Sequence, residues 1–414
     1  MTNADDYYDD LEAREPAARE AALFAALPGH LEWAVKGAPA VAAQLSGIDP
    51  CGVGGRAALA TIPVLRKSEL IERQRADMPL GGLATVGMAG FAHLFSSPGP
   101  IYVPQSLRPD HWGIARALHA AGFRSGGLIH NTFSYHFSPG AWIMESGAHA
   151  LGCPVFPGGV GQTELQVRTI EELKPPYFTG TPSFLKIILE KGREMGADLS
   201  SLTAALVGGE AFPPSLQKEV AGYGIDAYQC YATADLGLIA YESPAREGLI
   251  LNEGIIVEII RPGTGEPVAE GEVGEVVVTT FVPEYPLIRF ATGDLSAIMA
   301  GPSPCGRTAP RIKGWMGRAD QTTKVRGLFV HPQQIAEVTA RHPEVLKARL
   351  SVTGGEGGDE MTLACEAEGG GEDLETAITE SIQAVCKVRG SVELVAPGSL
   401  ANDGKVIDDL RTYE

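Results

Sequence analysis

The sequence predicts an α/β fold with a large multi-layer N-terminal body and a small, mobile α+β C-terminal domain. Strands and helices alternate between residues 111 and 245, which is typical of parallel sheets flanked by helices. Residues 250–316 form a β-rich part, and a charged turn at 317–332, GRADQTTKVRGLFVHP, separates them from a shorter β/α segment. A charged turn between a large and a small module predicts the hinge of a lid.

The first 80 residues predict a helical layer that follows an acidic tail, NADDYYDDLE. The Ala/Glu-rich segment at 15–38 has apolar residues at helical spacing, and Pro28 with Gly29 is expected to break that helix once.

The segment from 111 to 190 predicts the βαβα units. HWGIARALHAAGF, at 111–123, is expected to form an amphipathic helix, and a short strand follows it. Loops after strands hold the ligands of such folds, so the residues after this strand are candidates for a pocket. A cluster of histidines and aromatic residues packs in a core more often than it binds a ligand, but the position after a strand favours a pocket. The cluster comprises His130, Asn131, Phe133, Tyr135, His136 and Phe137.

The segment from 200 to 245 contains two strand-to-turn transitions with acidic residues. Gly208 and Gly209 allow the backbone to approach a flat ligand closely, and Glu210 supplies a hydrogen-bond acceptor. The second transition, YATAD at 231–235, ends in Asp235, whose carboxylate can bind a hard cation.

The C-terminal part predicts a small domain at 319–414, joined to a body at 1–318. Within the charged turn, strand alternation is expected to place Lys324 and Arg326 on one face. Helices are expected near 333–345 and 372–387, with strands between them.

Charge and composition exclude several classes of function. The chain has 414 residues and a net charge of −18, from 51 acidic and 33 basic residues. Nucleic acids and anionic membranes require clustered Lys and Arg, so we expect neither as a partner. A basic leader and a stretch of ~20 apolar residues are both missing from the sequence, so a cytoplasmic protein is expected. The six cysteines are scattered and form no CxxC, which favours buried free thiols.

The order and spacing of the motifs resemble those of a known family. GGEAF at 208–212, YATAD at 231–235, TGD at 292–294, GRAD at 317–320 and DGK at 403–405 resemble the motifs of the phenylacetate–CoA ligase subfamily of acyl-adenylate-forming, AMP-binding enzymes. In that family, a carboxylic acid and MgATP give an acyl-adenylate and pyrophosphate. The small domain then rotates, and CoA attacks to give acyl-CoA and AMP.

The resemblance implies roles for individual residues. Lys405 is the expected adenylation lysine, Asp294 binds the ribose, Arg318 lies near ribose and phosphate, Asp320 is the hinge, and Asp235 approaches the Mg²⁺ of MgATP. The implied nucleotide-binding set is Gly208, Gly209, Glu210, Ala211, Tyr231, Ala232, Thr233, Asp294 and Arg318. The implied acid pocket is Phe133, Tyr135, His136, Phe137 and Gly208.

Two positions that contact phosphate depart from the family pattern. The family's phosphate loop is a Ser-Ser-Gly-Thr-Thr-Gly-Lys-Pro run, whereas here Ser96, Ser97 and Gly99 occur without the Thr pair or the Lys. Ala234 also replaces the Ser that precedes the family's acidic residue. One lost donor or cation lowers a rate by about 10²–10³. The loop therefore either supports a slower reaction or binds phosphate with a rebuilt structure, or it is an ordinary Pro-rich turn that binds nothing.

A third departure concerns zinc. Some relatives build a structural zinc site at positions that correspond here to Ser243, Ile250, Ser303 and Cys305. One thiolate of four ligands cannot hold tetrahedral zinc, so no structural zinc is expected.

The expected activity is therefore that of a carboxylic acid–CoA ligase, with ATP/AMP, Mg²⁺ and coenzyme A as cofactors and an aromatic acid as substrate. Relatives are often homodimers. Two alternatives stay open: a homologue impaired in ATP chemistry that binds AMP, acyl-CoA or acyl-adenylate, and an adenylating enzyme that transfers the acyl group to an acceptor other than CoA.

Overall fold

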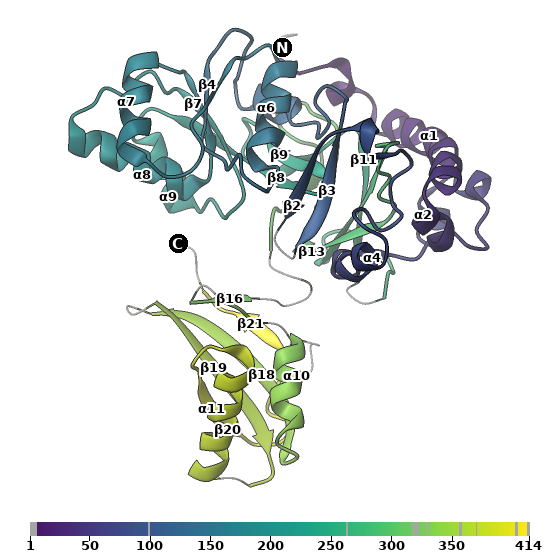
Figure 1. Cartoon of the computed structure of the whole chain (residues 1–414), viewed down its shortest axis with the longest axis vertical. Coiled ribbons are helices and arrows are strands. Elements are labelled where there is room, and N and C mark those ends of the chain that lie inside the picture. Colours follow the sequence, from purple (N-terminus) through teal and green to yellow (C-terminus); the bar gives the residue numbers. More distant parts are fainter. Residues whose placement is uncertain are drawn as a thin grey trace. The chain divides into compact units, whose positions relative to one another are not determined.

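The computed structural model describes residues 6–97, 100–261, 264–316, 319, 323–326, 328–330, 332–355, 358–369, 371–401 and 405–411. The chain divides into two compact units (Figure 1). The large unit comprises 1–292 with 296–315, and the small unit comprises 293–295 with 316–414. The assignment of functional domains to 1–318 and 319–414 stays a prediction.

A nine-stranded mixed sheet forms the centre of the large unit. Its strands β8, β7, β6, β4 and β5 run parallel, as the βαβα alternation predicts, and antiparallel strands continue it beyond β8. The order is β14 (Ile298–Met299), β15 (Arg311–Ile312), β10 (Leu249–Leu251), β9 (Gly237–Glu242), β8 (Asp226–Thr233), β7 (Ala204–Val207), β6 (Tyr177–Gly180), β4 (Ile129–Asn131) and β5 (Val155–Pro157).

Helices cover both faces of the parallel part. Side chains alternate across a strand, so on β7 Ala205 and Val207 pack with one set of helices while Ala204 and Leu206 face the other. The first set is α7 (Thr163–Leu173), α8 (Pro182–Met195) and α9 (Pro214–Ala221), and the second is α5 (Ala115–Ala120) and α6 (Gly140–Ala150). The prediction of an amphipathic helix at 111–123 is wrong. Helix α5 is shorter than predicted, and every residue in it is buried because it lies between α6 and β9.

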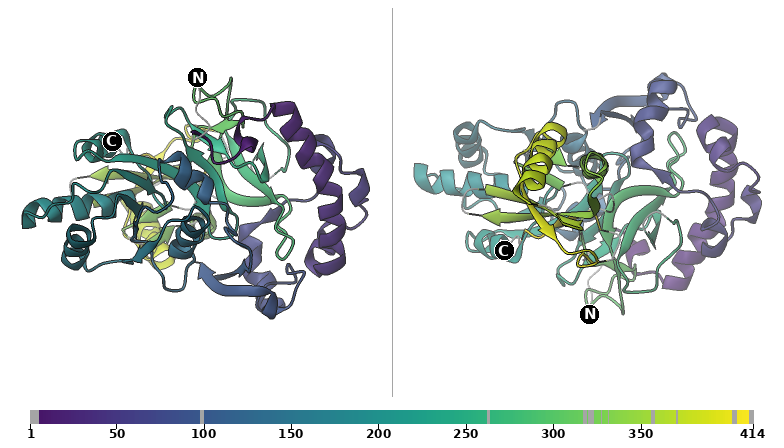
Figure 2. Two further views of the ribbon diagram at one scale, coloured as in Figure 1. Left: turned by 90° about the horizontal axis from the view of Figure 1, so that it is seen from above. Right: turned by 90° about the horizontal axis from the view of Figure 1, so that it is seen from below.

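A second sheet and an N-terminal helical layer complete the large unit. The sheet has the order β1 (Leu65–Arg66), β13 (Phe290–Ser296), β12 (Gly274–Thr280) and β11 (Ile255–Ile260). The purple N-terminal helices lie at the opposite end of this unit from α7 (Figures 1 and 2). These helices are α1 (Pro16–Gly37), α2 (Pro39–Gln44), α3 (Arg56–Leu59) and α4 (Leu70–Ala76). The hairpin of β2 (Phe91–Ser97) and β3 (Ile101–Ser106) stands apart from both sheets.

One prediction about the N-terminal region is wrong. Helix α1 continues through Pro28, since its buried side chains, among them Leu27 and Leu31, pack into the core and outweigh the lost backbone hydrogen bond. Within the acidic N-terminal segment, Glu12 is fully buried.

The small unit is a sheet covered by two helices. The sheet has the order β20 (Ser391–Val395), β19 (Gly358–Ala367), β18 (Val345–Gly355) and β21 (Ile407–Asp409). Apolar side chains of α10 (Pro332–Ala340) and α11 (Glu372–Cys386) share a core with Leu350 and Leu363 of this sheet. A hairpin of β16 (Thr323–Val325) and β17 (Leu328–Val330) precedes α10. The prediction that Arg326 shares a strand face with Lys324 is wrong, because Arg326 occupies the turn with a φ of 48°.

Among the residues that the structure describes, no helix is both long and apolar enough to cross a bilayer.

Candidate active site

The carboxyl ends of the parallel strands bring two of the sequence motifs together. The glycine turn after β7 faces the aromatic loop after β4: a Cβ atom on Gly209 would lie 3.7 Å from Phe133 Cε1. The same Cβ atom would lie 3.8 Å from Thr181 Cγ2, in the turn after β6. Gly209 has a φ of 82°, which favours glycine at this position. The candidate acid pocket and the candidate adenine turn are therefore neighbours in the large unit.

Glu210 is engaged at the start of α8. Its Oε1 accepts a hydrogen bond from Ser183 N at 2.6 Å, and Thr181 Oγ1 caps the same helix by accepting from Phe184 N at 3.3 Å. A carboxylate at a helix N-terminus is stabilised by the helix dipole. This contact fixes the Gly208–Glu210 turn, whereas contact of Glu210 with adenine stays a prediction. Ala211 follows it in the chain and is exposed.

The YATAD and TGD motifs also meet. Tyr231 Oη donates to Thr292 Oγ1 at 3.3 Å, which joins the end of β8 to β13. Thr233 Oγ1 accepts from Leu236 N at 3.2 Å and closes the turn that carries Asp235, while Ala232 in the same segment is half-buried. Asp294 lies further along β13, in the segment 293–295 that is grouped with the small unit, and is 9% exposed.

Asp235 forms an ion pair that the sequence reasoning missed. Its side chain is fully buried, and its Oδ2 lies 2.5 Å from Lys67 Nζ. Its Oδ1 is also buried and has no hydrogen-bond partner among the described residues. Burial and then the charge of Asp235 raise the pKa of the nearby Tyr285 hydroxyl. A buried carboxylate oxygen without a partner is the hard oxygen ligand that Mg²⁺ requires, so the site fits the predicted metal.

The aromatic loop holds a polar group inside an aromatic wall. Tyr135 Oη donates to Glu145 Oε2 at 2.7 Å and accepts from Asn131 Nδ2 at 3.0 Å. Burial and the Glu145 carboxylate raise the pKa of Tyr135. The Trp142 ring packs against Tyr135 at 5.6 Å between ring centroids. Glu145 and Asn131 come from α6 and the end of β4, and only the folded chain brings these polar groups to the tyrosine.

The other predicted residues of this loop differ in exposure. His136 and Phe137 are exposed, and Phe137 has a φ of 59°. His130 is fully buried, and burial lowers its pKa despite the hydrogen bond with Gln166. Since Gln166 Nε2 donates to two loop carbonyls, its Oε1 must accept from His130 Nε2 at 2.6 Å, which makes His130 a structural residue.

The candidate phosphate loop is a β-hairpin. Ser97 Oγ donates to Ile101 O at 3.2 Å across the hairpin, and Ser96 N donates to Phe137 O at 2.9 Å. Gly99 lies outside the described residues. The Ser97 hydroxyl is therefore already engaged within the hairpin.

Of the remaining predicted residues, Lys405 belongs to the small unit. Lys405 is half-exposed, with Nζ 3.3 Å from Asp408 Oδ1. Arg318 and Asp320 lie outside the described residues. Two of the positions compared above with a zinc site are adjacent in space: Cys305 Sγ lies 3.1 Å from Ser303 Oγ. Within the described residues, no group of three or more His, Cys, Asp or Glu is arranged to hold a metal ion.

Comparison with known proteins identifies the family. The AMP-binding enzyme family matches residues 115–280. Phenylacetate-coenzyme A ligase of Thermus thermophilus is 33% identical over 337 residues, which cover 78% of this chain and 75% of that relative. This chain belongs to the phenylacetate-coenzyme A ligase family. A second ligase of the same name, from Aromatoleum evansii, is 31% identical, and the matched region covers 81% of this chain and 79% of that relative.

The fold of the family extends to solved structures. A 2-hydroxyisobutyryl-CoA ligase in complex with 2-HIB-AMP and CoA, in its thioesterification state, has a TM-score of 0.76 and 26% identity over 99% of this chain and 94% of its own. The predicted resemblance, the mixed α/β fold and the enzyme class are thereby confirmed. The chain is an AMP-forming acid–CoA ligase that works through an acyl-adenylate, with ATP, Mg²⁺ and CoA as its cofactors.

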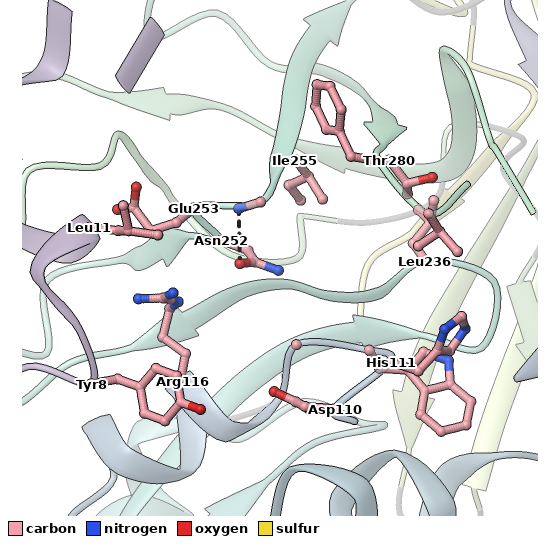
Figure 3. Close-up of a pocket in the computed structure, with 15 residues that line it drawn as sticks. Tyr8, Leu11, Asp110, His111, Arg116, Leu236, Asn252, Glu253, Ile255 and Thr280 are labelled. Carbon is pink, nitrogen blue, oxygen red and sulfur yellow. Dashed lines mark hydrogen bonds between the residues drawn. The ribbon is translucent and has the colours of Figure 1, made fainter. Parts of the chain in front are cut away.

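A cavity of about 260 Å³ in the large unit has Leu236, the residue after Asp235, in its wall (Figure 3). It is lined by residues such as Tyr8, Asp110, Arg116 and Asn252, and by none of the predicted site residues. Its polar groups already have partners in the protein: Arg116 pairs with Asp9, Asp110 accepts from two backbone N–H groups, and Asn252 accepts from Gly254 N. We therefore assign the active site to the strand ends and not to this cavity.

Proposed function

We propose that the acid activated by this ligase is a substituted aryl acid. The observation that carries the proposal is the closeness of the Phe133 ring to the Gly209 turn, where an added Cβ atom would lie 3.7 Å from Phe133 Cε1, since it supports an aromatic wall beside the candidate nucleotide site. Tyr135, with Glu145 and Asn131 as its partners, adds a polar group that matches a ring substituent. The relatives are named for an aryl acid and a solved structural neighbour for a branched hydroxy acid, so a test of the proposal compares these two classes of acid.

The proposed roles follow the chemistry of adenylation. Asp294 accepts hydrogen bonds from the ribose hydroxyls, and Asp235 holds Mg²⁺. The residues that surround the adenine base are the Gly208–Glu210 turn, Ala211, Tyr231, Ala232 and Thr233. Bound Mg²⁺ would neutralise phosphate charge during attack by the carboxylate. Lys405 would bring a second positive charge to the α-phosphate, and Arg318 would bind near ribose and phosphate.

A panel of acids tests this proposal. Pyrophosphate release is measured with aryl acids, with 2-hydroxyisobutyrate and with straight-chain acids, each with and without CoA. We expect release with aryl acids at a kcat/KM at least about tenfold above that for alkyl acids, because each buried aromatic contact contributes about 1 kcal/mol or more. A preference for alkyl acids would contradict the aryl assignment.

A second candidate function is binding without efficient adenylation. Two observations favour it: the Ser97 hydroxyl is engaged with Ile101 O, and Ala234 lacks a hydroxyl. It predicts that AMP or an acyl-CoA raises the melting temperature while pyrophosphate release stays at background for every acid. Pyrophosphate release without thioester formation would instead indicate transfer to an acceptor other than CoA.

The proposal also concerns the cellular setting. The enzyme is proposed to act as a cytoplasmic homodimer on small molecules, without nucleic acid or membrane partners, in agreement with its net charge of −18. Light scattering of the purified protein tests the dimer.

A further inference from the structure

The ion pair between Lys67 and Asp235 places a cation inside the candidate active site. Lys67 Nζ lies 2.5 Å from Asp235 Oδ2, although 168 positions separate the two residues in the sequence. The Asp235 side chain is fully buried, whereas 27% of the Lys67 side chain is exposed. The carboxylate is therefore fixed, while the lysine has access to solvent and to a bound ligand.

Strand pairing explains how Lys67 reaches this position. β1 runs parallel to β13, with Leu65 opposite Phe290 and Arg66 opposite Ala291. Lys67 directly follows Arg66 of β1, and Thr292 directly follows Ala291 of β13. Thr292 begins the TGD motif and accepts the hydrogen bond of Tyr231. Lys67 thus stands where the TGD motif and the YATAD motif approach each other.

The candidate phosphate loop supplies no such cation. Residues 96–107 contain neither Lys nor Arg, and the Ser97 hydroxyl bonds to Ile101 O. The four negative charges of a nucleoside triphosphate need positive groups in a site that excludes water. The neighbouring Arg66 is directed elsewhere, because its Nη1 pairs with Glu275 Oε2 at 3.0 Å.

We propose that Lys67 binds the phosphate chain of ATP and replaces the missing lysine of the phosphate loop. The inference rests on the proposed function of Asp235 as a magnesium ligand, because a phosphate oxygen that binds the same Mg²⁺ as Asp235 comes within reach of the Lys67 ammonium group. Before nucleotide binds, Lys67 neutralises Asp235. When Mg²⁺ takes the carboxylate, the flexible four-carbon stem of Lys67 lets the ammonium group turn to a phosphate oxygen.

Binding of ATP and adenosine separates this role from general effects on the fold. Titration calorimetry with Mg²⁺, in the absence of any acid, is carried out on the wild type, Lys67→Gln, Lys67→Arg and Arg66→Gln. We expect Lys67→Gln to weaken ATP binding by about ten- to hundredfold, the usual effect of one hydrogen bond to a charged group, and to leave adenosine binding unchanged. Lys67→Arg should restore most of the ATP affinity, and Arg66→Gln should retain it.

A double-mutant cycle keeps the test decisive if Lys67→Gln destabilises the protein by leaving Asp235 unpaired. If Lys67 acts only by neutralising Asp235, adding Lys67→Gln to Asp235→Asn changes ATP affinity no further. If Lys67 contacts phosphate, the double variant binds ATP about tenfold or more weakly than Asp235→Asn alone. Equal affinities of these two variants would overturn the inference. A wild type that binds neither ATP nor adenosine would instead overturn the proposed function, and the inference with it.

Discussion

Tyr231 Oη donates a hydrogen bond to Thr292 Oγ1 at 3.3 Å and so links two motifs that lie 61 residues apart. This contact ties the end of a strand in the nine-stranded sheet to β13 of the second sheet. It fixes the position of the segment that carries Asp235 relative to Thr292, the first residue of the TGD motif.

Substitution of Asp294 tests the proposed ribose contact. Asp294→Asn should weaken AMP binding by about tenfold or more, because hydrogen bonds from two ribose hydroxyls to a carboxylate lose the contribution of its charge. Calorimetric titration with AMP measures the change. Tyr231→Phe is the control: it removes the link to Thr292 but leaves the carboxylate, so we expect a loss of less than about fivefold. Equal losses in both variants would assign Asp294 a structural role only.

Gly209 offers a test with a closely matched control. Gly209→Val and Gly224→Val both place a side chain at a positive φ, of 82° and 83° respectively, which destabilises each by about 1–2 kcal/mol. A Cβ atom on Gly224 meets nothing within 4 Å, whereas one on Gly209 contacts Phe133 and Thr181. Only Gly209→Val should therefore raise the KM for the acid and for ATP, by about tenfold. Steady-state kinetics and thermal melts of both variants check this.

Lys405 is proposed to act in adenylation only. Lys405→Ala should lower the rate of pyrophosphate release by about 10²–10³, because a positive charge at the α-phosphate is lost. Thioester formation from a chemically prepared acyl-adenylate and CoA should change by less than about tenfold, since that step does not need the charge. Asp408→Asn, which removes the ion-pair partner of Lys405 at 3.3 Å, is the control and should retain adenylation. Loss of both half-reactions in Lys405→Ala would contradict the assignment.

The sequence predicted what depends on neighbours along the chain. The βαβα alternation and the turns after strands are local patterns, so the parallel sheet and the positions of Gly209 and Asp235 after their strands follow from them. Lys67 was missed because its contact with Asp235 depends on the pairing of β1 with β13, and neither strand specifies this pairing by itself. The break predicted at Pro28 is wrong for a related reason: α1 stays continuous because its apolar face packs against residues that are distant in the sequence.

Two histidines predict how stability depends on pH. Burial lowers the pKa of His30 and of His111 to about 4, because desolvation disfavours the charged imidazolium. Between about pH 6.5 and pH 4 the unfolded chain binds protons that the folded chain does not. This part of the stability is therefore present above pH 6.5 and is lost as the pH falls towards 4, at no more than about 1.4 kcal/mol per pH unit for each histidine.

Denaturant unfolding between pH 7 and pH 4.5 measures this loss. The double variant His30→Gln with His111→Gln should unfold with a free energy that depends less on pH in this range. His149→Gln, at an exposed position on α6, is the control and should retain the wild-type slope. A slope unchanged by the double variant would assign the acid sensitivity to other groups.

Glu12 anchors the N-terminal segment to the large unit through buried charges. Its fully buried carboxylate lies 3.1 Å from Arg116 Nη1 and 3.0 Å from Arg307 Nε, and it accepts from Tyr241 Oη at 3.0 Å. Glu12→Gln should lower the free energy of unfolding by about 3–5 kcal/mol, because it leaves two buried guanidinium groups with less negative charge around them. Glu20→Gln removes a carboxylate that pairs with Arg56 at 2.6 Å on the exposed surface and should cost less than about 1 kcal/mol. Urea unfolding of the two variants at pH 7 measures both values. Similar losses in the two would show that burial of Glu12 adds nothing to its ion pairs.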